Sequence, residues 1–164
     1  MGEDGVYARP LDASGPNTRG LREQAIVELF AAQLQRISKG RQVILVLPAP
    51  RPLVDIPRYY ATRMWWGSPL PEKEGFPRAY EDALGTPLRE IFARAIAAAD
   101  LPDNAITVID PADFSCDATT CDVIRDGKLL LSDENHPSLP GLDLFIPAIT
   151  EAITGPVTGS NSTD

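Results

Sequence analysis

The sequence predicts an α/β domain built on a parallel sheet. Residues 19–39 and 87–99 carry the 3.6-residue apolar pattern that is typical of helices. Each is followed by a short β-branched and aliphatic run, 42–47 and 105–109, the composition of a strand buried on both faces. A helix followed by a buried strand, occurring twice, is typical of a parallel sheet covered by helices.

Length and composition indicate one globular domain. The chain has 164 residues, 43% of them hydrophobic and 23% charged. We expect a domain over residues 1–153 and a disordered, Gly/Ser/Thr-rich tail over 154–164. The net charge of −8 argues against binding to nucleic acid and to an anionic membrane surface. No apolar run is long enough for a transmembrane helix, and the first residues do not resemble a signal peptide.

The N-terminal part is predicted to be an arm followed by a helix and a strand. Residues 1–18 are rich in Gly, Asp and Pro and contain one short apolar piece, Val6-Tyr7-Ala8. The helix over 19–39 ends before Gly40, which can adopt a left-handed conformation at a helix end. The strand over 42–47 stops at a series of prolines.

Residues 48–77 are predicted to form a long loop that is rich in aromatic residues. In a parallel sheet, the loops at the carboxyl ends of strands line the ligand crevice. The loop aromatics could therefore contact a substrate, or they could form a lid over the domain's own core or a patch facing a partner. The candidate substrate-lining residues are Tyr59, Tyr60, Trp65 and Trp66.

Further elements are predicted in the second half of the chain. Two helices are expected at about 77–85 and 87–99, the second with Pro87 in its first turn. Asp126-Gly127 is a turn signal within a hairpin over 122–131. A final helix is expected over about 140–153, kinked by Pro147 inside it.

Cys116 and Cys121 are the two cysteines of the chain. Four intervening residues can close a small loop and bring the two Cα atoms to disulfide distance. Two free thiols or half of a metal site are the alternatives, although a zinc site would need two further ligands and the chain has a single histidine. A disulfide would indicate an oxidising compartment.

Asp133 and His136 form the candidate catalytic pair. A histidine can take a proton from a nucleophilic hydroxyl when a carboxylate fixes its orientation and tautomer, and an aspartate three residues earlier in a turn can do this. The alternative is a lone surface histidine after a turn.

The order of these motifs resembles a known family. The chain has, in order, a buried strand, Asp110-Pro-Ala-Asp-Phe114, the two cysteines, a Gly127-Lys128 hairpin, and Asp133-Glu-Asn-His136 followed by Ser138 and Gly141. This order resembles the SGNH-hydrolase-like domain of proteins that carry acyltransferase-3 membrane domains. The resemblance implies a three-layer α/β/α, flavodoxin-like parallel sheet. It also implies a disulfide between the cysteines and a Ser-His-Asp triad in which His136 and Asp133 serve as base and orienting acid.

The sequence departs from that family's pattern at the nucleophile. The family's serine lies in a Gly-Asp-Ser block after the first strand, and the chain contains no such block. Neither Gly2-Glu3-Asp4 nor Ala13-Ser14-Gly15 follows a buried strand. We therefore expect a domain that is truncated at its N-terminus, that lacks the first strands, and that has no esterase activity as an isolated chain.

The resemblance implies a function at the cell surface of bacteria. The expected reaction is O-acetylation or deacetylation of a polysaccharide such as lipopolysaccharide or peptidoglycan, outside the cytoplasm, without a metal or other cofactor. The expected partners are an acyl donor from a membrane acyltransferase domain and a polysaccharide acceptor. The alternatives are a non-catalytic module of the same fold that binds a glycan or a protein, and a flavodoxin-like cytosolic protein in which Asp133 and His136 are incidental.

Overall fold

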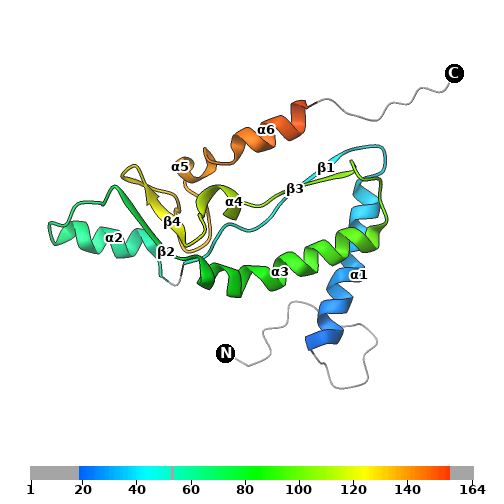
Figure 1. The fold of residues 1–164 in the computed structure, drawn as a ribbon, viewed down its shortest axis with the longest axis horizontal. Helices are drawn as coiled ribbons and strands as arrows, with labels where there is room; N and C mark the ends of the chain where they lie inside the picture. Colours follow the sequence, from blue (N-terminus) through cyan, green and yellow to red (C-terminus); the bar gives the residue numbers. More distant parts are fainter. Residues whose placement is uncertain (1–18, 53, 156–164) are drawn as a thin grey trace. The chain divides into compact units, whose positions relative to one another are not determined.

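The computed structural model describes residues 19–52 and 54–155 (Figure 1). The chain divides into two compact units. The first comprises Met1–Val43 and Pro87–Ile106, and the second comprises Ile44–Thr86 and Thr107–Asp164. The elements in chain order are α1 (Arg19–Ile37), β1 (Val43–Val46), α2 (Ile56–Trp65), β2 (Lys73–Pro77), α3 (Arg78–Ala99), β3 (Ile106–Ile109), α4 (Ala112–Ser115), β4 (Thr120–Arg125), β5 (Lys128–Leu129), α5 (Leu139–Leu142) and α6 (Ile146–Thr154). The mixed α/β class agrees with the sequence prediction.

The first unit is held together by α1 and the C-terminal half of α3. Leu34, Ala31 and Ala99 are its buried centre, with exposed fractions between 1% and 6%. The Gln35 side-chain amide donates to the carbonyl oxygen of Ala99 at 3.0 Å and ties the two helices together. Of the apolar residues in the pattern that predicted the first helix, Leu34 is buried here, whereas Leu29 and Ile37 are 61% and 40% exposed.

The predicted parallel pairing is present between β1 and β3. The Val43 amide donates to the Ala105 carbonyl and the Leu47 amide to the Ile109 carbonyl, each at 2.8 Å, so both strands run in the same direction. The prediction that these strands are buried on both faces is wrong within the described residues. Val46 and Val108 keep 40% and 45% of their surface exposed, because β1 and β3 form a sheet of only two strands there.

The second unit contains an antiparallel sheet in the order β2-β4-β5. The predicted hairpin joins β4 and β5 through Asp126 and Gly127, whose φ angles of 52° and 68° match the turn that favours Asp-Gly. Val123 and Ile124 of β4 share one core cluster with Ile56 and Tyr60 of α2. The core residues of this unit are Ile56, Tyr60, Val123, Ile124 and Leu131.

The predicted loop over 48–77 is wrong in its second part, which contains α2 and β2. The start of α2 follows standard helix chemistry. The Asp55 side chain accepts a hydrogen bond from the Arg58 amide at 3.1 Å, and Pro57 lies in the first turn, where its missing N–H costs nothing. The prolines that suggested a loop therefore include one that starts a helix.

Two further boundaries also differ from the prediction. The two helices expected over 77–85 and 87–99 are one helix, α3, which continues through Pro87. The expected final helix is divided into α5 and α6, and Pro147 lies in the first turn of α6 rather than inside it. The predicted N-terminal arm lies outside the described residues, as does the predicted tail beyond residue 155, whereas Thr154 is still helical.

Candidate active site

The candidate catalytic pair lies in a short closed loop after β5. Leu131 and Pro137 form an antiparallel bridge, which brings the two ends of the loop together. Inside it, the Ser132 amide donates to the His136 carbonyl oxygen at 2.8 Å, and the Ser132 hydroxyl donates to the same oxygen at 3.1 Å. We call residues 132–137 the histidine loop.

Asp133 organises the histidine loop through both of its carboxylate oxygens. Oδ1 accepts hydrogen bonds from the backbone amides of Asn135 and His136, each at 2.8 Å. Oδ2 lies 2.7 Å from Nδ1 of the His136 ring. The Asn135 amide, followed by the two bonds from His136, lowers the Asp133 pKa to about 2, so the carboxylate is ionised at neutral pH.

This geometry defines what the His136 ring can do. Because an ionised carboxylate accepts the hydrogen bond at Nδ1, the neutral ring carries its proton on that nitrogen and leaves a lone pair on Nε2. The ring is 71% exposed, so Nε2 can be reached from solvent. The contact expected from the Asp133-x-x-His136 spacing is present, and it is the arrangement that a general base requires.

Ser138 and Gly141 fasten the histidine loop to the sheet. The Ser138 hydroxyl donates to the Leu129 carbonyl oxygen at 2.5 Å and accepts from the Gly141 amide at 3.2 Å, which caps α5. A Cβ atom at Gly141 would overlap the carbonyl oxygen of Leu130, so α5 can approach this close only with glycine at that position.

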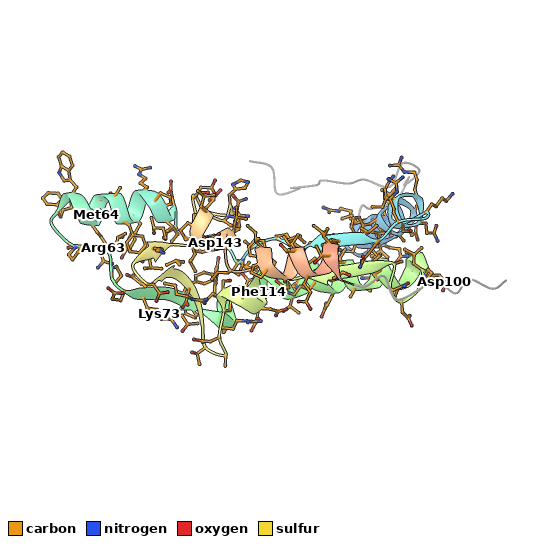
Figure 2. The ribbon with its side chains drawn as sticks, turned by 90° about the horizontal axis from the view of Figure 1, so that it is seen from above. Arg63, Met64, Lys73, Asp100, Phe114 and Asp143 are labelled. Carbon is orange, nitrogen blue, oxygen red and sulfur yellow. A yellow bond between two sulfur atoms is a disulfide. The ribbon has the colours of Figure 1, made fainter. Side chains whose placement is uncertain are left out.

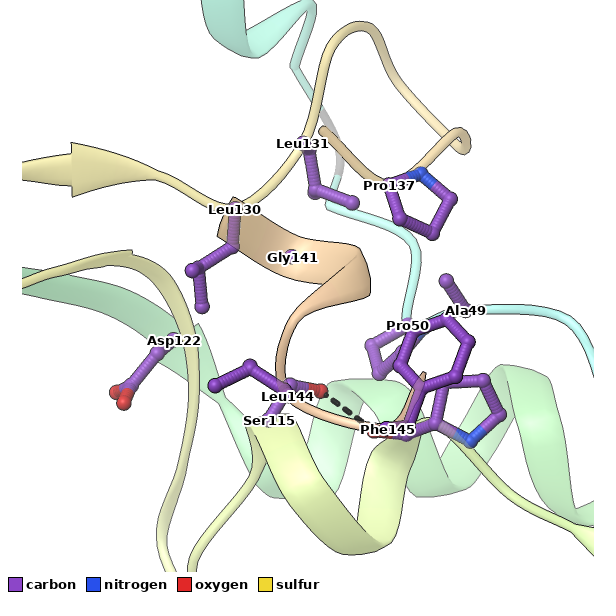
Figure 3. A pocket seen from close by; sticks show the side chains of 11 residues that line it. Ala49, Pro50, Ser115, Asp122, Leu130, Leu131, Pro137, Gly141, Leu144 and Phe145 are labelled. Atoms are coloured by element: carbon purple, nitrogen blue, oxygen red, sulfur yellow. Dashed lines mark hydrogen bonds between the residues drawn. The ribbon is translucent and has the colours of Figure 1, made fainter. Parts of the chain in front are cut away.

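A small cavity lies below the histidine loop, with Leu131 and Pro137 in its wall (Figure 3). Its volume of about 20 Å³ admits one water molecule and no substrate. A larger hollow of about 360 Å³ lies beside the end of β3, and sequence reasoning missed it. Its lining comes from β3, α4 and α6, and includes Ile109, Asp113, Phe114, Ala148 and Glu151.

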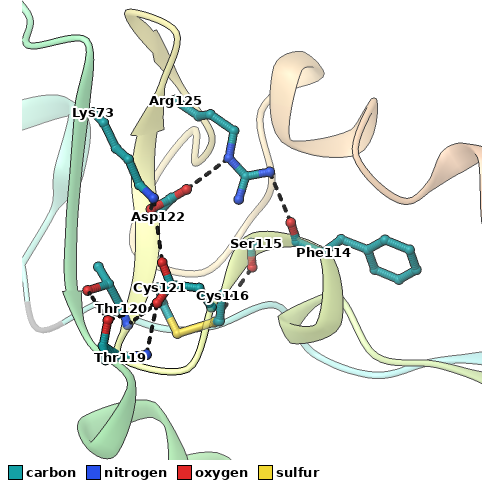
Figure 4. A network of polar contacts seen from close by, with 10 residues as sticks. Lys73, Phe114, Ser115, Cys116, Thr119, Thr120, Cys121, Asp122 and Arg125 are labelled. Atoms are coloured by element: carbon teal, nitrogen blue, oxygen red, sulfur yellow. Dashed lines mark hydrogen bonds and ion pairs between the residues drawn. A yellow bond between two sulfur atoms is a disulfide. The ribbon is translucent and has the colours of Figure 1, made fainter.

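The two cysteines form a disulfide, as the sequence suggested, which excludes the free-thiol and metal-site alternatives for them (Figure 4). The bridge closes a loop between α4 and β4. Inside this cystine loop, Asp117 Oδ1 accepts from the amides of Thr119 and Thr120, each at 2.8 Å. These two bonds, helped by the Thr119 hydroxyl, lower the Asp117 pKa to about 2.

A buried carboxylate next to the disulfide anchors β4 (Figure 4). The Asp122 side chain is 2% exposed, and its Oδ2 accepts from Arg125 Nε at 2.8 Å. Its Oδ1 has no hydrogen-bond partner but lies 3.4 Å from Lys73 Nζ, which also lies 3.5 Å from Asp117. Two cations therefore balance Asp122, and the strand that leads to the histidine loop is fixed at its base.

No hydroxyl group of residues 19–52 or 54–155 forms a recorded hydrogen bond with the His136 ring. The Ser138 hydroxyl, two positions after His136, donates to the Leu129 carbonyl oxygen, and the Ser132 hydroxyl donates to the carbonyl oxygens of His136 and Pro137. The Ser115 hydroxyl donates to the Pro111 carbonyl oxygen at 3.0 Å. No Ser-His-Asp triad is therefore assembled among the residues that the structure describes.

The predicted substrate-lining aromatics fall into two groups. Tyr60 is 2% exposed and belongs to the core, so its ring is not available to a ligand, which corrects that prediction. Tyr59, Trp65 and Trp66 are 43%, 86% and 80% exposed. The role of these three as substrate-lining residues stays a prediction.

The comparison with known families matches this architecture. The family described as "SGNH domain (fused to AT3 domains)" matches residues 4–151. No curated protein and no solved structure matches the chain. The chain therefore belongs to the SGNH domain family, a hydrolase-like class of domains associated with acyltransferases.

Within the described ranges there is neither a helix suited to crossing a membrane nor a group of metal-ligating side chains. None of the helices in residues 19–52 and 54–155 combines the length and the apolar character that crossing a bilayer requires. Over the same residues, no three His, Cys, Asp or Glu side chains are grouped in a way that could hold a metal ion.

Proposed function

We propose that this chain provides the histidine and aspartate of an SGNH-type O-acyltransferase or acetylesterase that acts on a cell-surface polysaccharide. The observation that carries the proposal is the 2.7 Å contact between Asp133 Oδ2 and His136 Nδ1 within a chain of this family. A carboxylate, an oriented imidazole and a free Nε2 are two of the three parts of an acyl-transfer site.

The reaction would pass through a serine ester. The serine hydroxyl attacks the acyl carbonyl of the donor, His136 Nε2 takes the hydroxyl proton, and the donor's leaving group departs with that proton. A hydroxyl of the polysaccharide, or water, then attacks the ester carbonyl and gives its proton to Nε2. The acyl group moves to the acceptor, and the serine oxygen recovers the proton from His136. Asp133 stays ionised and stabilises the imidazolium in both steps.

The serine would come from a segment other than the described residues, and the acyl group from a membrane acyltransferase. The description of the family as fused to AT3 domains supports such a membrane partner. The disulfide supports a location outside the cytoplasm, because such bonds persist in oxidising compartments.

The function can be tested in cells from which the gene for this chain has been removed. We expect a lower content of ester-linked acetyl groups on the surface polysaccharide, measured by alkaline release of acetate. The wild-type gene should restore it, and His136→Ala should not. Glu134→Gln is the matched control, because Glu134 lies in the same loop and is 59% exposed. Restoration by His136→Ala would exclude the catalytic role and favour the binding module.

The purified chain gives a second test of the same proposal. We expect no hydrolysis of p-nitrophenyl acetate above the rate of the His136→Ala variant, because the serine is missing from the described part. A serine-dependent rate that disappears in His136→Ala would show that the chain carries its own nucleophile and would contradict this part of the proposal.

The orientation of His136 can be measured without any activity. The chain has one histidine, so its two ring nitrogens are unambiguous in a ¹⁵N NMR spectrum. We expect the neutral ring to carry its proton on Nδ1 in the wild type and to shift toward the Nε2-protonated form in Asp133→Ala. An unchanged spectrum would mean that Asp133 does not orient the ring.

A further inference from the structure

The direction of the His136 ring is not fixed by packing. The histidine loop lies between β5 and α5 in the chain, and Asp143 marks the end of α5 in Figure 2. The ring is 71% exposed, so few neighbours limit rotation about its side-chain bonds. A catalytic group must nevertheless be held within roughly 0.5 Å of its productive position. The hydrogen bonds of the loop therefore have to supply the orientation that packing does not.

Two consecutive residues hold the backbone of His136 from its two sides. On the amide side, Asp133 Oδ1 accepts a hydrogen bond from the His136 N–H at 2.8 Å. On the carbonyl side, the Ser132 amide donates to the His136 oxygen at 2.8 Å, and the Ser132 hydroxyl donates to the same oxygen at 3.1 Å. The peptide groups before and after the His136 Cα atom are both anchored, which sets the direction of its Cα–Cβ bond.

The Ser132 hydroxyl is committed to the segment that carries the imidazole. It donates to the carbonyl oxygen of His136 and, at 3.4 Å, to that of Pro137, so its single proton is shared between two consecutive carbonyl groups. Ser132 is exposed, and water could satisfy an exposed hydroxyl equally well. The two bonds are therefore not needed to compensate for burial, and they contribute to the shape of the loop.

The cystine loop has a covalent bond at the equivalent place. There the residue before the aspartate is Cys116, which is bonded to Cys121, five positions later. In the histidine loop the residue before the aspartate is Ser132, whose hydroxyl reaches the Pro137 carbonyl oxygen, also five positions later. In both loops the residue before the aspartate connects the two sides of the turn, through a disulfide in one and through a hydroxyl in the other.

Asp133 couples the position of the His136 backbone to that of the ring. Its Oδ1 accepts from the His136 amide, and its Oδ2 lies 2.7 Å from Nδ1 of the ring. A displacement of the His136 backbone therefore disturbs both contacts together. Because a hydrogen bond weakens steeply when its donor and acceptor are misaligned, releasing the His136 carbonyl should alter the orientation of the ring.

We propose that Ser132 is a positioning residue for His136. Its hydroxyl holds the His136 carbonyl group, which keeps Nδ1–H directed at Asp133 Oδ2 and Nε2 in a constant position. Ser132 acts through the backbone and touches neither the substrate nor the reacting atoms. Its effect on the ring is independent of catalysis, whereas its effect on the rate of acyl transfer rests on the proposed function.

The ¹⁵N NMR spectrum of the single histidine tests this role directly. In Ser132→Ala we expect the ratio of the Nδ1-protonated to the Nε2-protonated neutral ring to fall roughly twofold to tenfold. The effect is partial because the bond from the Ser132 amide remains. Three-bond couplings of the His136 side chain should change from those of one rotamer to an average over several. Ser132→Thr keeps the hydroxyl and should give the wild-type ratio.

Two control variants separate this hydroxyl from hydroxyls and loop residues in general. Thr150→Val removes an exposed hydroxyl of α6 that donates to the Ile146 carbonyl oxygen at 3.0 Å. Glu134→Gln changes an exposed side chain of the histidine loop itself. Both should leave the His136 ratio unchanged, with circular dichroism to show that each variant is folded. A wild-type ratio in Ser132→Ala, or the same change in Ser132→Ala and Ser132→Thr, would overturn the proposal.

The consequence for the reaction is measured in the cell-based acetylation assay. Ser132→Ala should lower the rate at which acetyl groups are added roughly twofold to tenfold, and Ser132→Thr should restore it. A loss of activity in Ser132→Ala with an unchanged ring spectrum would mean that the hydroxyl acts on the substrate, which would overturn the positioning role. Restoration of acetylation by His136→Ala would contradict the proposed function, whereas the spectrum of Ser132→Ala would still decide whether the hydroxyl orients the ring.

Discussion

The cystine loop and the histidine loop are built with the same local device and used for different purposes. In each, an aspartate Oδ1 accepts the amides two and three residues later, and its pKa is lowered to about 2. The difference lies in Oδ2. In Asp117 it faces Lys73 at 3.5 Å, whereas in Asp133 it holds the His136 ring at 2.7 Å.

The comparison shows how a common turn becomes a candidate catalytic element. Two amide bonds to Oδ1 fix the rotamer of the aspartate, which leaves Oδ2 as a pre-oriented acceptor. A lysine opposite that acceptor forms an exposed ion pair of little energetic value. A histidine bonded through Nδ1 gains a defined tautomer and presents Nε2. A backbone bridge closes each loop, and the cystine loop has the disulfide in addition.

The largest expected difference between the two loops is in activity. In the cell-based acetylation assay, Asp133→Asn should reduce acetyl transfer roughly 10³- to 10⁴-fold, because the amide no longer holds the required tautomer. Asp117→Asn changes the same chemical group in the same kind of turn and should alter activity by less than about twofold. Equal losses in both variants would mean that Asp133 has only a structural role.

Stability should depend on the closure of the cystine loop. Replacing Cys116 and Cys121 by alanine removes a bridge that spans a sequence separation of five residues, and the entropic model predicts a loss of about 2 kcal/mol in the free energy of unfolding. Urea denaturation of the oxidised wild type and the double variant measures this loss. Identical midpoints would show that the local hydrogen bonds close the loop without the disulfide.

Both loops should lose stability in acid over the same pH range. The folded pKa of Asp133 and of Asp117 is about 2, below the ordinary value of 3.8. Their contribution is therefore fully present above pH 4 and is lost as the pH falls toward 2. Chemical denaturation at a series of pH values should show the wild type converging on Asp133→Asn and Asp117→Asn over this range. A difference that stays constant down to pH 2 would contradict the lowered pKa values.

The smallest effect is expected for the ion pair between Arg51 and Glu134. The two side chains are each 59% exposed and 3.7 Å apart. Glu134→Gln should change the free energy of unfolding by less than about 0.5 kcal/mol, because exposed pairs are screened by water. A loss above 1 kcal/mol in thermal denaturation would show that this contact helps to close the histidine loop.

Features that depend on nearby residues could be predicted from the sequence. The first helix, the Asp126-Gly127 hairpin and the contact between Asp133 and His136 all arise from residues a few positions apart, and all three are present. The cystine pairing was accessible for the same reason.

The features that were predicted wrongly depend on what surrounds a residue. Pro57, expected in a loop, and Pro147, expected to kink a helix, lie in the first turns of helices, and Pro87, expected to begin a helix, lies within one. The burial of Tyr60 depends on β4, which follows about sixty positions later. The exposure of Val46 and Val108 depends on the number of neighbouring strands, which no local pattern encodes.

The hydrogen bonds within residues 132–137 connect residues at most five positions apart, and the bond from the Ser138 amide to the Leu130 carbonyl oxygen closes the loop. Contacts between residues near in sequence therefore bring Asp133 and His136 together. The geometry of the Asp133–His136 pair therefore depends on a short stretch of the chain. It could be encoded on a different polypeptide from the serine it serves, with the two brought together by association rather than by covalent continuity.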